Sequence, residues 1–306
     1  MALATLTYPE AIVIGLLQGV TELFPVSSLG HSVLLPAVIG GRWAQDLNMS
    51  ADQSPYLAFL VAVHVATAVA LVWFYRADWV RIVRGFVSSV RQRSITEPDQ
   101  RLAWLLIVAT IPVGLVGLAL EHTVRTMFGR PLPVSLFLIL NGVLLATVER
   151  LRSRRRAVPV PVGAGGVYAS TTADDPDRRI ATQSWRQVLL IGSAQILALL
   201  PGVSRSGAAI GAGLVRGLSH EDAARFAFLL ATPVIAAAGV LKLPELAGPA
   251  GHGILGPVLA GSLVAGLAAY VSLRFLTRYF ETRTLTPFAI YCVLAGLGGI
   301  AVSLTA

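Results

Sequence analysis

Charged side chains are scarce in this chain of 306 residues: they make up 13% of it, whereas hydrophobic residues make up 55%. A typical water-soluble domain carries about twice this share of charge. The composition therefore excludes a water-soluble domain of this length, and it predicts that lipid is the solvent for most of the chain.

Cysteine is also nearly absent. Cys292 is the only one, which rules out a disulfide within the chain, and its apolar surroundings point to a packing role. The sequence has no P-loop, no Rossmann glycine fingerprint, no HExxH pair and no haem-attachment motif, so nucleotide-driven and redox chemistry are disfavoured. The first apolar run has no basic residues before it and no cleavage site after it, so we expect no removable signal peptide.

Long apolar runs dominate what is present. Each is close to the roughly 20 residues that a helix needs to cross the hydrocarbon core of a bilayer. We therefore predict six membrane-spanning helices, at residues 55–75, 103–120, 133–149, 226–243, 255–273 and 286–304.

The net charge of +8 raises the question of nucleic-acid binding, but the basic residues are grouped between the apolar runs. Four segments hold 19 of the 24 basic residues: 76–101, 150–186, 216–225 and 274–283. With six spans, all four can lie on one side of the membrane, which the positive-inside rule makes the cytoplasm. Both termini then face outward, and we expect no nucleic-acid partner.

The two halves of the chain resemble each other. Residues 14–30 align with 191–207 at seven of seventeen positions, and the thirteen residues from Ala58 align with those from Ala227 at six. The fold is therefore predicted to be a repeat. We assign 1–150 to the first repeat, 186–306 to the second, and the Arg-rich, Pro/Gly-rich stretch 151–185 to a flexible cytoplasmic linker, for which contact with anionic lipid is an alternative role.

Each repeat contains a polar break flanked by apolar runs too short to span a bilayer. The charge pattern places the first break toward the outside and the second between two cytoplasmic segments, so the repeats are predicted to be inverted. The predicted fold is an all-α integral membrane protein with six transmembrane helices and two re-entrant half-helix pairs. Non-helical backbone at membrane depth must be buried in protein or line a wet cavity, so two such breaks are predicted to form one site.

The first break has the sequence QGVTELFPVSSLGHS, residues 18–32. Gln18 and Glu22 are four residues apart and so share one helix face, which points toward the Ser27 and Ser28 turn. A carboxylate at membrane depth is costly, which makes Glu22 a candidate metal ligand or base, although a structural hydrogen bond would also explain it.

The second break has the sequence PGVSRSGAAIGAG, residues 201–213. Its Arg205 lies between Ser204 and Ser206 and is followed by Gly207 at the start of a new helix. A guanidinium, hydroxyl groups and free helix amides together suit a phosphate group. An arginine that only reaches for the membrane surface is the alternative.

Two histidines complete the polar residues near the breaks. His31 could act as a nucleophile, as a general base or as an orienting donor, or be a buried structural histidine. For His64, in the middle of a span, a role in a cavity and a hydrogen bond between helices are equally supported.

Both breaks resemble the two signature motifs of the undecaprenyl-diphosphate phosphatase family, also called bacitracin-resistance proteins. The resemblance continues through ATIPVGLVGLALE at Ala109, LFLILNGVLL at Leu136, FAFLLATPVIAAAG at Phe226 and LTPFAIYCVLAG at Leu285, and so covers nearly the whole chain. It implies a phosphatase of the bacterial cell membrane that removes the terminal phosphate of a C55 isoprenoid diphosphate. It also implies a role in recycling this lipid carrier for peptidoglycan synthesis, and a divalent cation, Mg or Ca, as cofactor.

The resemblance also implies roles for residues. Glu22, Ser27, His31 and Arg205 match catalytic positions of the motifs. We assign Glu22 and Gln18 to the metal, and we assign the following residues to substrate binding: Ser28, Gln195, Ser204, Ser206 and Gly207. The attack is assigned to Ser27 or His31, acting directly or through water, at a site that faces outward.

Three positions depart from the pattern of the family. Gln18 stands where many relatives have Glu, which removes one charge from the expected carboxylate pair and should weaken binding of a divalent ion, although Gln also occurs there in relatives. Leu29 replaces a small hydroxyl residue, and Leu60 stands where many relatives place an acidic residue.

Two other functions fit the same residues. Inverted repeats with broken helices are a transporter plan, so a flippase of a prenyl phosphate is the main alternative, and a lipid-binding relative without activity is the other. An enzyme should fail when Glu22 loses its charge, whereas a flippase could tolerate the change. Small-residue stretches such as 211–217 permit close helix packing and are compatible with a homodimer.

Overall fold

The computed structural model describes residues 6–47, 55–128, 130–156, 175–242 and 253–305. Every regular element in these ranges is helical. Six of the helices are long and apolar enough to cross a membrane: residues 55–74, 98–120, 131–154, 220–240, 255–282 and 286–304. The predicted all-α class and the count of six are thereby confirmed, and the chain is a multi-pass membrane protein.

The helices follow one another as α1 (Tyr8–Thr21), α2 (Ser28–Ile39), α3 (Gly41–Asp46), α4 (Pro55–Phe74), α5 (Arg76–Gln92), α6 (Pro98–Phe128), α7 (Pro131–Arg156), α8 (Pro176–Ala181), α9 (Trp185–Ala194), the short 3-10 helix η1 (Gln195–Leu199), α10 (Arg205–Val215), α11 (His220–Lys242), α12 (Leu255–Thr282) and α13 (Thr286–Thr305). Three of the six spans begin a few residues earlier than predicted, at Pro98, Pro131 and His220. Two of these starts are prolines, which the first position of a helix tolerates.

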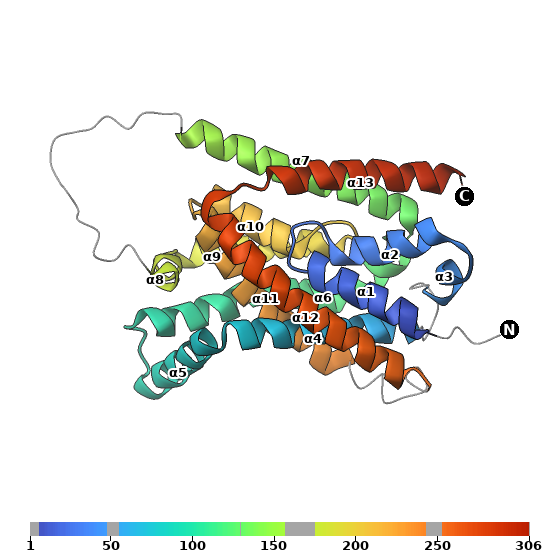
Figure 1. Ribbon diagram of the computed structural model, residues 1–306. Helices are drawn as coiled ribbons and strands as arrows, with labels where there is room; N and C mark the ends of the chain where they lie inside the picture. Colours follow the sequence, from blue (N-terminus) through green and yellow to red (C-terminus); the bar gives the residue numbers. More distant parts are fainter. Residues whose placement is uncertain (1–5, 48–54, 129, 157–174, 243–252, 306) are drawn as a thin grey trace.

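The spans assemble from both halves of the chain. α7 and α13 lie side by side along one edge of the molecule, and α12 crosses the bundle in contact with α1 and α4 (Figure 1). α9 packs on α6 in the same way that α1 packs on α12. The core is therefore shared between the halves.

The two breaks have a similar layout, in which a short helix begins at the residue after a serine. In the first, α1 ends before Glu22 and α2 begins at Ser28; in the second, η1 ends at Leu199 and α10 begins at Arg205. Both pairs of short helices match the residues that the sequence alignment equates. The inverted membrane orientation of the repeats, the re-entrant course of these pairs and the two repeat boundaries stay predictions.

Two equivalent glycines permit the closest helix crossings. A Cβ atom on Gly15 of α1 would overlap the carbonyl oxygen of Gly261 in α12, and one on Gly192 of α9 would overlap the carbonyl oxygen of Ala109 in α6. Both glycines lie where backbone meets backbone, which leaves no flexible side chain to move aside.

Replacing Gly15 by Ala should therefore destabilise the protein by about 1–3 kcal/mol, the usual cost of overpacking. The measurement is thermal unfolding of the purified protein in detergent. Gly298→Ala is the matched control, because a Cβ atom there meets nothing within 4 Å and alanine is the better helix former. Equal melting temperatures for the two variants would contradict the close crossing.

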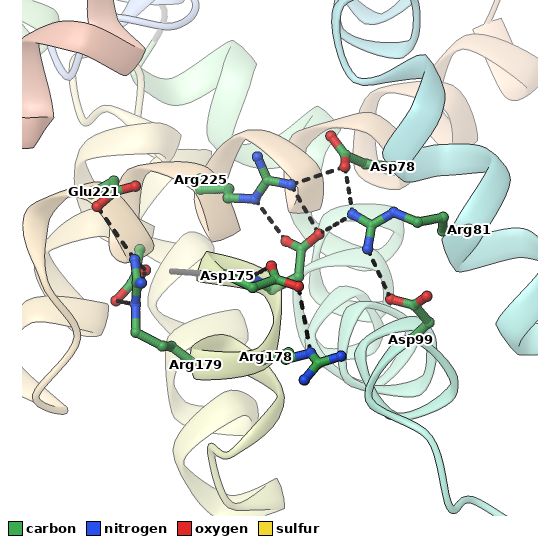
Figure 2. Close-up of polar contacts among 10 residues, drawn as sticks. Asp78, Arg81, Asp99, Asp175, Arg178, Arg179, Glu221 and Arg225 are labelled. Carbon is green, nitrogen blue, oxygen red and sulfur yellow. Dashed lines mark hydrogen bonds and ion pairs between the residues drawn. The ribbon is translucent and has the colours of Figure 1, made fainter. Parts of the chain in front are cut away.

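The end of the predicted linker is structured. Residues 157–174 lie outside the described residues, but Asp177 of α8 is buried and ion-paired to both Arg81 of α5 (2.7 Å) and Arg225 of α11 (2.7 Å). These two arginines approach from opposite sides, and Asp78 contacts both (Figure 2). The expectation of a flexible linker over 151–185 is therefore wrong at both ends: α7 continues to Arg156, and α8 covers Pro176–Ala181. The Asp177 carboxylate holds α8 against the bundle by pairing with two of its arginines.

Burial alone would raise the pKa of Asp177, but its hydrogen bonds to Arg225 and Arg81 outweigh burial and hold the pKa below its usual value of 3.8. A lowered folded-state pKa means that the carboxylate stabilises the fold fully above pH 3.8 and loses this effect as the pH falls below it.

We expect Asp177→Asn to cost about 3–5 kcal/mol at neutral pH, because it leaves two arginines without their buried partner. Below pH 3.8 its melting temperature should approach that of the wild type. Asp99→Asn removes a more exposed partner of Arg81 and should cost under about 1 kcal/mol. A stability difference between wild type and Asp177→Asn that does not change with pH would argue against this ionised network.

Candidate active site

Glu22 is the centre of a polar cluster drawn from four helices. It follows the last turn of α1 and is 7% exposed. Its Oε2 accepts hydrogen bonds from Gln18 Nε2 (3.0 Å) and Ser28 Oγ (2.5 Å), and lies 3.3 Å from His64 Nε2 in α4. Its Oε1 accepts from Arg205 Nη2 at the start of α10 (2.5 Å). The carboxylate thus joins both breaks, because Glu22 and Arg205 are 183 residues apart in the chain.

The two breaks present helix N-termini to the same region. Ser27 Oγ accepts from the amide of Gly30 (3.2 Å), and Ser204 Oγ accepts from the amide of Gly207 (3.1 Å), so each serine caps its helix at the same spacing. Because a helix N-terminus carries partial positive charge and free amides, two that meet favour an anion.

Glycine allows these turns to touch. A Cβ atom on Gly30 would lie 3.1 Å from the Cα atom of Gly202 in the second break, and one on Gly207 would lie 3.2 Å from the Cβ atom of Pro25 in the first. Ser27 also has a positive φ of 68°, which is unfavourable for a residue with a side chain and is a frequent feature of functional sites.

Asn141 of α7 holds the two breaks together. Its Nδ2 donates to the carbonyl oxygen of Pro25 (3.0 Å), and its Oδ1 accepts from the amide of Ser204 (3.0 Å). Ser206 Oγ adds a bond to the carbonyl oxygen of Phe24 (3.2 Å). These bonds satisfy backbone groups that a helix break would otherwise leave unpaired in a membrane.

His31 is fixed at both ring nitrogens. Its Nδ1 lies 2.7 Å from the carbonyl oxygen of Ser27 and its Nε2 lies 2.7 Å from the hydroxyl of Tyr291 in α13, whose ring stacks on the imidazole. A carbonyl only accepts, so Nδ1 carries a proton, and in a neutral ring Nε2 accepts from Tyr291. The imidazole is therefore oriented by two elements.

The remaining predicted residues have local partners. Ser204 and Ser206 bond to each other (3.1 Å), and Gln195 donates to the carbonyl oxygen of Gly192 (3.4 Å). Among the residues that the structure describes, no hydrogen bond joins Gln195 to the Glu22 cluster, so its role in substrate binding stays a prediction.

The oxygen atoms of Glu22 and Gln18 are of the kind that hard divalent cations bind. Gln18 Oε1 is buried without a hydrogen-bond partner in the structure, and it lies on the amide group that contacts Glu22. Among the residues described, no three His, Cys, Asp or Glu side chains gather as a complete metal site. One carboxylate and one amide oxygen suit Mg²⁺ or Ca²⁺ when phosphate oxygens and waters supply the other ligands.

Comparison with known proteins decides the family. Residues 11–298 match the family described as bacitracin resistance protein BacA. The chain belongs to the BacA family. A protein named undecaprenyl-diphosphatase from Mycolicibacterium paratuberculosis is 62% identical over 295 residues, which cover 96% of each chain. Proteins named undecaprenyl-diphosphatase 2 from Frankia alni and Burkholderia orbicola are 54% and 42% identical over at least 93% of each chain.

The family membership confirms the resemblance drawn from the two motifs. It does not by itself assign roles to residues, and those stay predictions for this BacA-family chain. The predicted site does not include Asn141 or Tyr291, and it leaves the role of His64 open. A single histidine in an apolar span is the signal that points to His64; the sequence gives no comparable signal for the other two.

The structure shows the contacts of Gln18 and Leu60, two of the three residues that depart from the family pattern. Gln18 keeps a hydrogen bond to Glu22 that a second carboxylate could not donate. Leu60 is buried, and its carbonyl oxygen accepts from His64 Nδ1 (2.7 Å). This bond leaves His64 Nε2 to face Glu22, so the backbone of Leu60 orients the histidine.

Proposed function

We propose that this protein hydrolyses undecaprenyl diphosphate to undecaprenyl phosphate and inorganic phosphate. The observation that carries the proposal is the pairing of Glu22 with Arg205 and Ser28 where two helix N-termini meet. The relatives named undecaprenyl-diphosphatase, 62% identical over 96% of the chain, support the same substrate.

The site can bind a diphosphate through positive charge and donors. Arg205 supplies a guanidinium, and the first turns of α2 and α10 supply backbone amides and partial positive charge. These groups would also stabilise the charge that spreads over the phosphoryl oxygens in the transition state. The prenyl chain remains in lipid, where the outer surfaces of the spans are apolar.

Ser28 is the nucleophile that the hydrogen bonds favour. Its hydroxyl donates to Glu22 at 2.5 Å, so the carboxylate can accept its proton while Oγ forms a bond to the terminal phosphorus. The bond from that phosphorus to the bridging oxygen breaks, and the prenyl phosphate leaves with the electron pair. Water then attacks the phosphorus of the phosphoserine, the bond from that phosphorus to Ser28 Oγ breaks, Oγ regains the proton from Glu22, and inorganic phosphate leaves. Ser27 Oγ instead accepts the Gly30 amide, which suits a capping role.

A divalent cation, Mg²⁺ or Ca²⁺, would be held by Glu22 and the unpartnered Oε1 of Gln18. When bound, it would neutralise charge on the diphosphate. His31 would keep the first turn of α2 in place through its bond to Ser27 and its contact with Tyr291.

We place the protein in the bacterial inner membrane, with the active site facing outward. The grouping of arginines supports this orientation through the positive-inside rule. The reaction then regenerates a lipid carrier for peptidoglycan synthesis. A homodimer is compatible with the exposed small residues of the spans.

The test is phosphate release from a prenyl diphosphate by the purified protein in detergent, with Mg²⁺ or Ca²⁺ and with a chelator. Release that requires the ion supports the enzyme and its cofactor. No release by a folded wild type that binds the lipid would overturn the enzyme in favour of a flippase, which transport of a fluorescent prenyl phosphate across vesicles would detect.

Comparison of Ser28→Ala with Ser27→Ala separates the two hydroxyls. We expect Ser28→Ala to lower phosphate release by about a thousandfold or more, because it removes the attacking atom. Ser27→Ala should lose far less, through a weaker cap costing about 1 kcal/mol. When the terminal phosphate of the substrate is labelled, phosphopeptide mapping after a rapid acid quench should find that phosphate on Ser28. A larger loss in Ser27→Ala would reverse the assignment.

A further inference from the structure

The last turns of α12 and the residue that follows them form a basic and aromatic surface. An open groove of about 660 Å³ runs along it. We call this surface the α12 arginine stripe; its residues are Tyr270, Val271, Arg274, Phe275, Arg278, Tyr279, Thr282 and Arg283. They come in neighbouring pairs four residues apart, and Arg283 directly follows the end of the helix. Residues four apart lie on one helix face, so their side chains form a continuous strip.

The length of α12 places this stripe at the membrane surface. Residues 255–273 contain no Asp, Glu, Lys or Arg, and at 1.5 Å per residue they cover about 28 Å, close to the thickness of the hydrocarbon core. Arg274 is the first charged residue after this apolar stretch. The turns that follow it in the same helix therefore lie at the level of the lipid headgroups.

The stripe carries a surplus of positive charge. Arg274, Arg278 and Arg283 are exposed, and none of them forms an ion pair with another residue that the structure describes. Glu281 is the only acidic residue in 270–283. The acidic side chain in this segment thus balances only part of the positive charge of the arginines, and an anion from the surroundings would balance the rest.

Aromatic contacts fix the shape of the stripe. Phe275 stacks on Phe24 of the first break, with ring centroids 5.9 Å apart, and the Tyr279 hydroxyl donates to the carbonyl oxygen of Thr284 (3.0 Å). Tyr270 packs edge-on against Phe74 of α4. Tyrosines at this depth are typical of the interface between lipid and water, so the arginines extend from a fixed aromatic base.

We propose that the α12 arginine stripe binds the headgroup of an anionic phospholipid of the surrounding membrane. The phosphate lies between Arg274 and Arg278, which are one helical turn apart, with Arg283 at the end of the groove, and the acyl chains follow the apolar face of α12 toward Leu267 and Val271. This lipid is distinct from the proposed substrate, because the arginines that hold it are exposed on the outside of α12, whereas Glu22 and Ser28 are buried.

The test is native mass spectrometry of the full chain. The protein is mixed in detergent with phosphatidylglycerol or with phosphatidylcholine of the same acyl chains, and the lipid that stays bound after removal of the detergent is measured. Wild type should retain phosphatidylglycerol preferentially. The triple variant Arg274→Gln, Arg278→Gln and Arg283→Gln should bind it at least about tenfold more weakly, because each arginine near an anionic headgroup contributes around fivefold.

A second triple variant separates a specific site from general charge. Arg84→Gln, Arg186→Gln and Arg216→Gln removes the same charge from three exposed arginines on separate elements, and it should keep the preference. The variant Arg274→Lys, Arg278→Lys and Arg283→Lys should keep most of the preference for phosphatidylglycerol, because it keeps the charge. Equal losses in both Gln variants, or a wild type without preference, would overturn the proposal. Because no step measures phosphate release, the result is independent of the proposed reaction.

Discussion

Replacing Glu22 by Gln should lower phosphate release by about a thousandfold or more. The glutamine has nearly the same shape, so the change tests the charge. Its amide can no longer accept the proton of Ser28 or attract Arg205 across the two breaks, and it is a poorer ligand for a divalent ion. A thousandfold loss corresponds to about 4 kcal/mol of transition-state stabilisation.

Glu10→Gln is the matched control on the same helix. Glu10 is also buried, but it bonds to Thr7 as the capping box of α1, a role that glutamine fills as well. Its phosphate release should stay within about twofold of wild type. If Glu22→Gln kept full release, Glu22 would be a structural residue. If it instead kept lipid transport while wild type released no phosphate, the flippase interpretation would gain.

The pairing of Gln18 with Glu22 could be predicted, because a spacing of four residues places two side chains on one helix face whatever the rest of the fold does. The six spans could also be predicted, since the thickness of the bilayer sets the length that an apolar helix needs to cross it. The alignment of the two breaks also located Ser27 and Ser204, and the structure gives both the same capping bond.

Contacts between distant helices could not be predicted in this way. Tyr291 lies 260 residues from His31 and sits in a span whose sequence gives no sign of its partner. Asn141 resembles any polar residue in a membrane helix until α7 is placed against both breaks. The difference between Ser27 and Ser28 depends on backbone direction: a positive φ at Ser27 turns the next hydroxyl toward Glu22, and the order of residues does not reveal this.

Replacing Arg205 by Ala should lower phosphate release by about a hundredfold to a thousandfold, the usual cost of removing one group that stabilises transition-state charge. Arg205→Lys should lose less, because it keeps a positive charge but not the planar fork that matches two phosphate oxygens. Arg216→Ala, at the exposed end of the same helix, is the control and should behave as wild type. A rise in KM alone would mean that Arg205 binds substrate and transition state equally.

The single alanine variant leaves Glu22 as a buried charge without its arginine, which should also destabilise the fold. The double variant Glu22→Gln and Arg205→Ala removes both charges, and so should melt at a higher temperature than Arg205→Ala alone. The double variant should release phosphate no more slowly than the less active of the two single variants, because groups that act as one unit lose their effect together. If the two losses instead multiplied, Glu22 and Arg205 would act on separate steps, and one site built from both breaks would be wrong.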